Sequence, residues 1–300
     1  MDKKKFIFSY NKRAFSLIEL SIVILIIGIL VAGVTQSSRL IKAMKIQSAR
    51  QLTMSSPVPS ISNLNLWLET TLEKSFNDTE TSNGSTITKW YDINSQSSFK
   101  NDAYQTNTTR APIYNFNESL PLVNFNGNND GQFFNLPDDT IPSGDSAFTM
   151  FLAIRLAKDA AAKNHDFLCA GMWSNPITLI RLDNTNGFKF TNFTGGVGST
   201  VYWPQTSNQA VGTLTLFTAS YKNTNQRFVS AHVNGVQSFQ VNVADARSTG
   251  SGYNRISGNG WVNFEYFRGD IAELIIFSKF LNDEERKSVE SYIMKKWSIK

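Results

Sequence analysis

Cysteine and histidine are nearly absent from this sequence. One cysteine, Cys169, and two histidines, His165 and His232, occur among 300 residues. A lone cysteine forms no disulfide within the chain, so a folded domain must be stabilised by its hydrophobic core. The positions of these three residues do not match a zinc site or a Ser-His-Asp triad. We expect Cys169 to be a buried apolar residue and His232 to be a hydrogen-bonded strand residue.

Excess charge is also scarce beyond the N-terminal region. The formal net charge is +5, but residues 1–14 carry +4 and residues 15–60 carry +3, which leaves −2 for residues 61–300. A protein that binds nucleic acid needs a basic surface to neutralise phosphates. The larger part of this chain lacks that surface, so we expect no nucleic-acid partner.

Proline is missing between Phe15 and Pro57, and this interval contains a long apolar run. Residues 15–34 read FSLIELSIVILIIGILVAGV, in which Glu19 is the one charged residue. Twenty helical residues span roughly 30 Å, the thickness of the hydrocarbon core of a bilayer. The run predicts a helix that crosses a membrane, and the prolines of the following SSPVPS stretch end that helix by residue 56.

A carboxylate inside a membrane helix is costly and needs a partner or a route to water. The run could belong to a cleaved secretory signal, but it is too long, and no small-x-small cleavage site follows it before Arg39. A signal anchor in which Glu19 reaches water at the helix edge stays open on charge and length alone.

The residues before the run indicate a third alternative. The leader MDKKKFIFSYNKRA is short and basic, it ends with Ala14, and the apolar run begins abruptly at Phe15. This N-terminus resembles that of a type IV prepilin. The resemblance implies that a prepilin peptidase cuts between Ala14 and Phe15 and that the new Phe15 amine is methylated. Glu19 is then the fifth mature residue, and it is expected to pair with the Phe15 amine of a neighbouring subunit, because both charges are costly in an apolar bundle unless paired.

The resemblance also implies a location and partners. The chain is expected in the bacterial inner membrane with its leader in the cytoplasm, and later in the periplasm or a cell-surface filament with other pilin-like subunits. Two features depart from the family: Ala14 stands where glycine is usual, and the helix lacks the proline of many major pilins. The choice between a pilus and a secretion pseudopilus therefore stays open.

Beyond residue 61 the chain is rich in Asn, Thr, Ser, Gly and aromatic residues that alternate in short runs. Residues 147–156, AFTMFLAIRL, have the two-residue period of a strand, and Asn234-Gly235 separates two further runs as in a β-hairpin. The chain ends with an apolar strand over 271–277 and a helix that begins after Asn282, the residue expected to cap it.

These patterns predict a mainly β protein in four segments: a leader at 1–14, a transmembrane and stalk helix at 15–56, a linker at 57–62, and an antiparallel β-sandwich with a short C-terminal helix at 63–300. In that final helix, Val289, Ile293 and Trp297 share one face and are expected to pack on the sandwich.

Several phrases of the large segment carry a second resemblance. LNLWLE, TKWYDINSQSSFKNDA, PLVNFNGNNDGQFF and the strand-plus-helix ending occur in the order seen in concanavalin A-like, laminin-G-type jelly rolls. Such domains include lectins and sugar hydrolases. A retaining hydrolase needs two carboxyl groups about 5 Å apart, and no strand here carries alternating acids. Glu273 lies within an apolar strand, where we expect it to form a structural ion pair.

Two groups of residues are candidate binding sites. Asn126, Asn128 and Asp130 in NGNNDG offer oxygen ligands for calcium, although a plain polar turn accounts for them as well. Trp173, Trp203 and Trp261, with Tyr202, lie in or near Gly/Ser/Asn-rich stretches and could form flat platforms for sugar rings, whereas core packing is the alternative. No cofactor is required.

Together the two resemblances imply a non-enzymatic, minor type IV pilin-like subunit whose head binds a glycan or another cell-surface ligand. A secretion-system pseudopilin that contacts exported cargo is the alternative, and a membrane-tethered glycan hydrolase ranks last.

Overall fold

The computed structural model describes residues 17–117, 119–127, 131–160, 164–171, 177–182, 188–194, 197–202, 211–224, 226–243, 247, 253–258 and 265–300. It divides into two compact units between Lys45 and Ile46. Helix α1 (Leu17–Met54) crosses this division. The helix ends just before the SSPVPS stretch, where the residues that precede proline disfavour helical backbone, as the sequence predicts.

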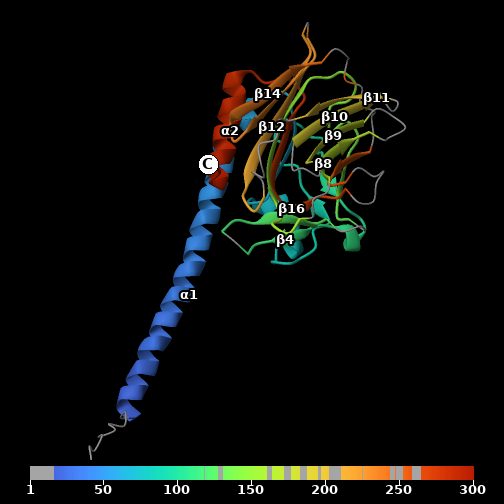
Figure 1. Cartoon of the computed structure of the whole chain (residues 1–300). Coiled ribbons are helices and arrows are strands. Elements are labelled where there is room, and N and C mark those ends of the chain that lie inside the picture. Colours follow the sequence, from blue (N-terminus) through green and yellow to red (C-terminus); the bar gives the residue numbers. More distant parts are fainter. Residues whose placement is uncertain are drawn as a thin grey trace, which may run out of the picture. The chain divides into compact units, whose positions relative to one another are not determined.

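The second unit, which we call the head, contains two antiparallel β-sheets (Figure 1). Sheet A follows the order β14 (Val236–Asn242), β13 (Phe228–Val233), β12 (Thr215–Lys222), β7 (Phe148–Leu156), β16 (Arg268–Phe277), β5 (Leu122–Asn126) and β4 (Ile113–Asn115), and β1 (Leu64–Glu69) also pairs with β16. Sheet B follows the order β11 (Val197–Tyr202), β10 (Phe188–Thr194), β9 (Ile177–Leu182), β8 (His165–Ala170), β15 (Asn254–Ile256), β6 (Phe134–Leu136), β3 (Ala103–Tyr104) and β2 (Lys89–Trp90). Short 3₁₀ turns occupy Val58–Ser60, Glu73–Ser75, Asp78–Glu80 and Thr108–Arg110. The predicted mainly β fold is confirmed.

The core lies between the inner faces of the two sheets. In β7, the alternating side chains of Phe148, Met150, Leu152, Ile154 and Leu156 all enter this core. The opposite face of the same strand is buried as well, because Phe151 and Ala153 belong to a second apolar cluster. The centre of sheet A is therefore covered on both faces, and its central strands read as nearly continuous apolar runs.

The second apolar cluster lies beneath helix α2 (Asp283–Trp297), which contacts β12 (Figure 1). The side chain of Asn282 accepts a hydrogen bond from the Glu285 backbone N–H, and the Glu285 carboxylate accepts one from the Asn282 backbone N–H, which completes the predicted capping box. Val289, Ile293 and Trp297 are buried on the sheet, as expected from their spacing.

The predicted hairpin joins β13 to β14. Asn234 and Gly235 have φ values of 49° and 76°, the left-handed pair that a tight two-residue turn requires. Glycine adopts this conformation without strain, and asparagine tolerates it better than most residues. The turn therefore forms where the local sequence favours it.

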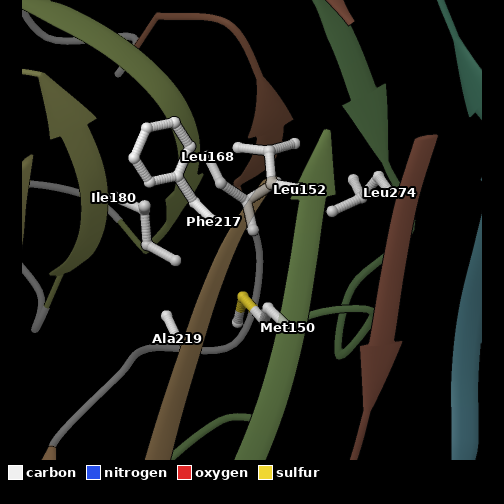
Figure 2. A pocket seen from close by; sticks show the side chains of 7 residues that line it. All are labelled: Met150, Leu152, Leu168, Ile180, Phe217, Ala219 and Leu274. Carbon is white, nitrogen blue, oxygen red and sulfur yellow. The ribbon is translucent and has the colours of Figure 1, made fainter. Parts of the chain in front are cut away.

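A small cavity of about 10 Å³ lies within the core of the sandwich. Figure 2 shows its walls, which consist of Met150, Leu152, Leu168, Ile180, Phe217, Ala219 and Leu274 from both sheets. The space is about that of one water molecule, and the apolar walls offer a water no hydrogen bonds. The cavity is therefore a packing void and is too small for a sugar.

Candidate functional site

The membrane-type helix places Glu19 in the first turn of α1. Ala14 and Phe15 lie outside the described residues. The apolar side chains of this part of the helix are exposed, with Leu17 at 86% and Ile24 at 62%. By length and composition the helix can cross a membrane. A surface this apolar is stable only in lipid or against other helices, which is consistent with a membrane-anchored, pilin-like subunit.

The last turns of α1 belong to the head. Ala49 and Thr53 are buried there. Nε of Arg50 donates to the carbonyl oxygen of Thr71 at 2.9 Å, and its Nη1 lies 2.7 Å from the Glu73 carboxylate. The Tyr292 hydroxyl from α2 lies 3.3 Å from the Thr53 hydroxyl. These contacts fix the end of the helix to the sandwich without a disulfide.

A fully buried ionic cluster lies beneath α2. Nζ of Lys296 lies 2.8 Å from Oε2 of Glu69 on β1 and 3.0 Å from Oε2 of Glu273 on β16, and all three side chains are inaccessible to solvent. The ring N–H groups of Trp67 and Trp297 and the Tyr292 hydroxyl donate to Glu273. Every carboxylate oxygen of this cluster thus has a donor, which offsets the cost of burying the charges.

The ion pairs of this cluster have a structural role. Burial raises the pKa of the Glu69 carboxyl, but Lys296 and the hydroxyls of Ser75 and Thr71 outweigh burial and hold that pKa at about 2. Glu69 and Glu273 are two neighbouring carboxylates, as in the acid pair of a hydrolase. Both, however, are paired with Lys296, and no substrate can reach them. The expected ion pair of Glu273 is present.

The calcium hypothesis involves Asn126, which ends β5, whereas Asn128 and Asp130 lie outside the described residues. The Asn126 N–H donates to Oε1 of Gln132 at 2.8 Å, and its carbonyl oxygen accepts from Nη1 of Arg268 at 3.0 Å. Among the described residues, no group of three or more His, Cys, Asp or Glu side chains could hold a metal ion. The calcium site stays a prediction.

The predicted aromatic platforms are likewise untested. Trp173, Trp203 and Trp261 lie outside the described residues, and Tyr202 is the last residue of β11. His232 lies in strand β13, as expected, but the expected hydrogen bonding was wrong for its buried Nδ1, which has no hydrogen-bond partner within the described part of the chain. The ring lies on the face of β13 opposite Ala231 and Val233, which enter the core, and the charged groups nearest to it include Arg286 of α2, whose guanidinium offers no acceptor.

The outer face of sheet B carries a polar and aromatic surface that the sequence analysis missed. Strand pairing places Tyr104, Asn135 and Arg255 side by side on β3, β6 and β15, while their neighbours along each strand point into the core. The Arg255 guanidinium lies 4.2 Å from the Phe133 ring centroid and 4.3 Å from that of Tyr253. We call these five residues the Arg255 face.

Local sequence gives little sign of this face. Its strands are two or three residues long, which is too short for a period to be read. The alternation of Phe134, Asn135 and Leu136 is the one available signal, because it places a polar residue opposite two apolar ones.

Comparison with known proteins supports the two resemblances. Residues 126–285, more than half of the chain, match the family model of the concanavalin A-like lectin/glucanases superfamily. The chain belongs to this superfamily. Residues 9–35 match the prokaryotic N-terminal methylation motif, so the prepilin-like N-terminus is confirmed as well. No curated protein matches the sequence significantly.

Solved structures share the fold of this superfamily member at low identity. The binding domain of Paraclostridial mosquitocidal protein 1 has a TM-score of 0.54 at 13% identity over 77% of this chain and 52% of that one. A botulinum neurotoxin type C structure, described as dependent on two ganglioside molecules for cell entry, has a TM-score of 0.51 at 10% identity over 79% and 53%. Domain 4 of a GH43 extracellular arabinanase from Geobacillus stearothermophilus, in complex with arabinotriose, has a TM-score of 0.44 at 17% identity over 61% and 81%. This chain thus spans about half the length of the two toxin chains.

Proposed function

We propose that this chain is a minor, non-enzymatic subunit of a type IV pilin-like filament and that its head binds a glycan. The proposal rests on one observation: the same chain has an N-terminal methylation motif and a lectin-type sandwich. The motif supports processing by a prepilin peptidase and assembly through the N-terminal helix. The lectin-type sandwich supports a binding role for the head. The toxin structures that share its fold also support this role, since one is a binding domain and the other belongs to a toxin whose cell entry depends on gangliosides.

The burial and ion pairing of the acidic side chains favour a binding role over hydrolysis. Glu69 and Glu273, which both pair with Lys296, are fully buried beneath α2. Asp166 and Glu265, two further described acids near sheet B, are both paired with Arg181. A carboxyl group that must give and take protons on a substrate needs access to that substrate.

The assembly half of the proposal is tested by mass spectrometry of the mature N-terminus. We expect cleavage between Ala14 and Phe15 and a methylated Phe15 amine. An intact leader in assembled filaments, or cleavage beyond Val34, would overturn the prepilin assignment.

The binding half is tested on a glycan array with the full-length protein, with and without calcium, followed by long incubation of each bound glycan and product analysis. We expect binding without cleavage. Binding that requires calcium and is lost in Asp130→Ala would assign the NGNNDG loop as a calcium site. Released oligosaccharide would contradict the non-enzymatic role, and an absence of binding to any glycan would contradict the lectin role.

A further inference from the structure

Arg255 differs from most arginines of the head in the partners that it has. Six arginines form ion pairs with carboxylates, namely Arg50, Arg155, Arg181, Arg227, Arg268 and Arg286. In the described part of the chain, Arg255 has no carboxylate within ion-pair distance. Its Nε donates to Oδ1 of Asn135 at 3.2 Å, and its Nη2 donates to the Tyr253 hydroxyl at 3.1 Å. A guanidinium has five N–H donors, so several remain for an external acceptor.

The position of this cation is fixed before any ligand arrives. Its plane is held by the Phe133 and Tyr253 rings, at 4.2 and 4.3 Å from their centroids. The residues on either side of it in β15, Asn254 and Ile256, are buried. A guanidinium held in this way loses little conformational freedom when it binds a carboxylate, which it can meet with two parallel hydrogen bonds.

Exposed aromatic rings flank the cation. Tyr104 is 43% exposed and Tyr253 is 38% exposed, whereas most aromatic side chains in the described part of the head are buried. Tyr104 and Arg255 both lie beside Asn135 in neighbouring strands, where facing side chains are about 5 Å apart. A flat apolar ring, an amide and a cation in one row match the apolar face, the hydroxyl groups and the carboxylate of one acidic sugar unit.

The charge of the whole head favours a single carboxylate over a polyacid. The head, residues 46–300, carries a net charge of −1, because Arg50 adds one positive charge to the −2 of residues 61–300, so an acidic peptide with many carboxylates meets weak overall repulsion. One acidic group aimed at one unpaired cation gains a charge-assisted bond without that penalty.

We propose that the Arg255 face binds a carboxylate-bearing sugar, with the carboxylate on Arg255, a hydroxyl on Asn135 and the sugar ring on Tyr104. This inference rests on the proposed lectin role of the head and names its ligand class and its site.

The test measures binding by titration calorimetry with the full-length chain in a detergent that has no sugar headgroup. The probes are galacturonic acid and sialyllactose, which carry one carboxylate each, with the methyl ester of galacturonic acid and lactose as uncharged counterparts. We expect an acidic probe to bind about tenfold or more tightly than its uncharged counterpart, and this preference to weaken as salt is raised.

Variants locate the site. Arg255→Gln should remove the preference for the acidic probe, and Arg255→Lys should keep part of it. Tyr104→Ala should lower the affinity for charged and uncharged probes alike. Lys222→Gln removes the same charge from β12 on the other sheet and should leave binding unchanged. Unaltered thermal unfolding of each variant separates loss of binding from loss of fold.

The outcomes distinguish the two proposals. Equal affinity for acidic and esterified probes, or tight binding of a polyglutamate peptide, would overturn the acidic-sugar assignment. Binding of an acidic sugar that Arg255→Gln leaves intact would overturn this site while the lectin role stands. Failure of every glycan to bind would overturn the lectin role itself.

Discussion

Lys296 binds the carboxylates of Glu69 and Glu273. Glu69 lies 227 positions before it in the sequence, and Glu273 lies 23 positions before it. Lys296 thereby ties the first strand of the head to its last helix. We expect Lys296→Met to lower the free energy of unfolding by about 3–5 kcal/mol, because the substitution leaves two buried carboxylates without their cation. Urea unfolding followed by tryptophan fluorescence measures this loss in the full-length chain, since all six tryptophans lie in the head.

The adjacent Lys295 is the matched control for this prediction. It lies on the same helical turn but is exposed, so Lys295→Met should change the unfolding free energy by less than about 0.5 kcal/mol. An equal effect of the two substitutions would mean that the buried cluster contributes nothing specific.

A local pattern could identify only one half of this cluster. The carboxylate of Glu273 within an apolar strand calls for a buried partner, and the ion pair was predicted on that ground. Helical spacing places Lys296 on the apolar face of α2, seven residues after Val289, and Lys295 on the opposite face. The local sequence does not show, however, that Glu69 of the first strand supplies the second carboxylate, because that contact depends on long-range packing.

We expect His232 to make the stability of the head sensitive to mild acid. Burial, and then the positive charge of Arg286, lower its pKa to about 4, although Asp283 opposes this and Lys287 adds to it. The unfolded chain, in which a histidine has a pKa near 6.5, therefore binds more protons between these two values. Stability should fall as the pH is lowered from about 6.5 to about 4 and lose nothing further from this group below that range.

We expect His232→Gln to lessen this loss of stability in acid, because an amide of similar size does not take up a proton. The measurement compares urea unfolding of the two proteins at pH 7 and pH 4.5. If both lose stability equally between these values, another group is responsible for the acid sensitivity.

Glu19 is expected to act in assembly rather than in folding. Glu19→Val removes the cost of a carboxylate in the membrane, so insertion should be unchanged or improved. Incorporation into filaments should fall, because the Phe15 amine of a neighbouring subunit then lacks its partner. Quantitative blotting of membranes and of sheared filaments separates the two effects.

Ser21→Val is the control, since it makes an equally apolar substitution two residues away in the same helix. It should insert and assemble normally. Normal incorporation of Glu19→Val alongside wild-type partners would instead indicate a carboxylate that simply reaches water.

At the scale of elements, the C-terminal end of α1 completes the head. Ala49 and Thr53 are buried, and Leu52 packs against the apolar cluster beneath α2. We expect residues 61–300 to fold as a soluble monomer but with an unfolding free energy about 2–4 kcal/mol below that of residues 46–300, because these contacts are lost. Urea unfolding of the two fragments measures the difference.

A substitution within the longer fragment checks the cause. Ala49→Glu places a charge in a buried site and should reproduce most of the loss, whereas Gln51→Glu at an exposed position should not. Fragments of equal stability would show that the last turns of α1 do not support the sandwich.

Elements with a strong local signal were predictable and those set by long-range pairing were not. The hairpin at Asn234-Gly235 and the cap at Asn282 follow from chemistry within a few residues. Strands β2, β3 and β15 have two or three residues each, and they exist because neighbouring strands hold them. The candidate ligand face is built from such strands, which is why the sequence analysis pointed to tryptophans and missed Arg255.

At the scale of the whole molecule, the chain combines an apolar helix that is stable in lipid or in a bundle with a head whose surface suits water. Such a chain can leave the membrane only if other helices replace the lipid around residues 17–34. On the proposed function, we therefore expect assembly and display to be coupled, with the head reaching the cell exterior as the helix enters a filament.

This coupling predicts where the native protein is found. We expect immunogold labelling with antibodies against the head to mark extracellular filaments on intact cells, at sparse positions because a minor subunit is present in few copies. The label should disappear from filaments in Glu19→Val cells, while the protein remains in the membrane fraction. An unrelated inner-membrane protein with one spanning helix serves as the control and should give no surface label. Label confined to the periplasm of wild-type cells would instead favour a secretion pseudopilus, in which the head contacts exported cargo and the Arg255 face has no access to glycans outside the cell.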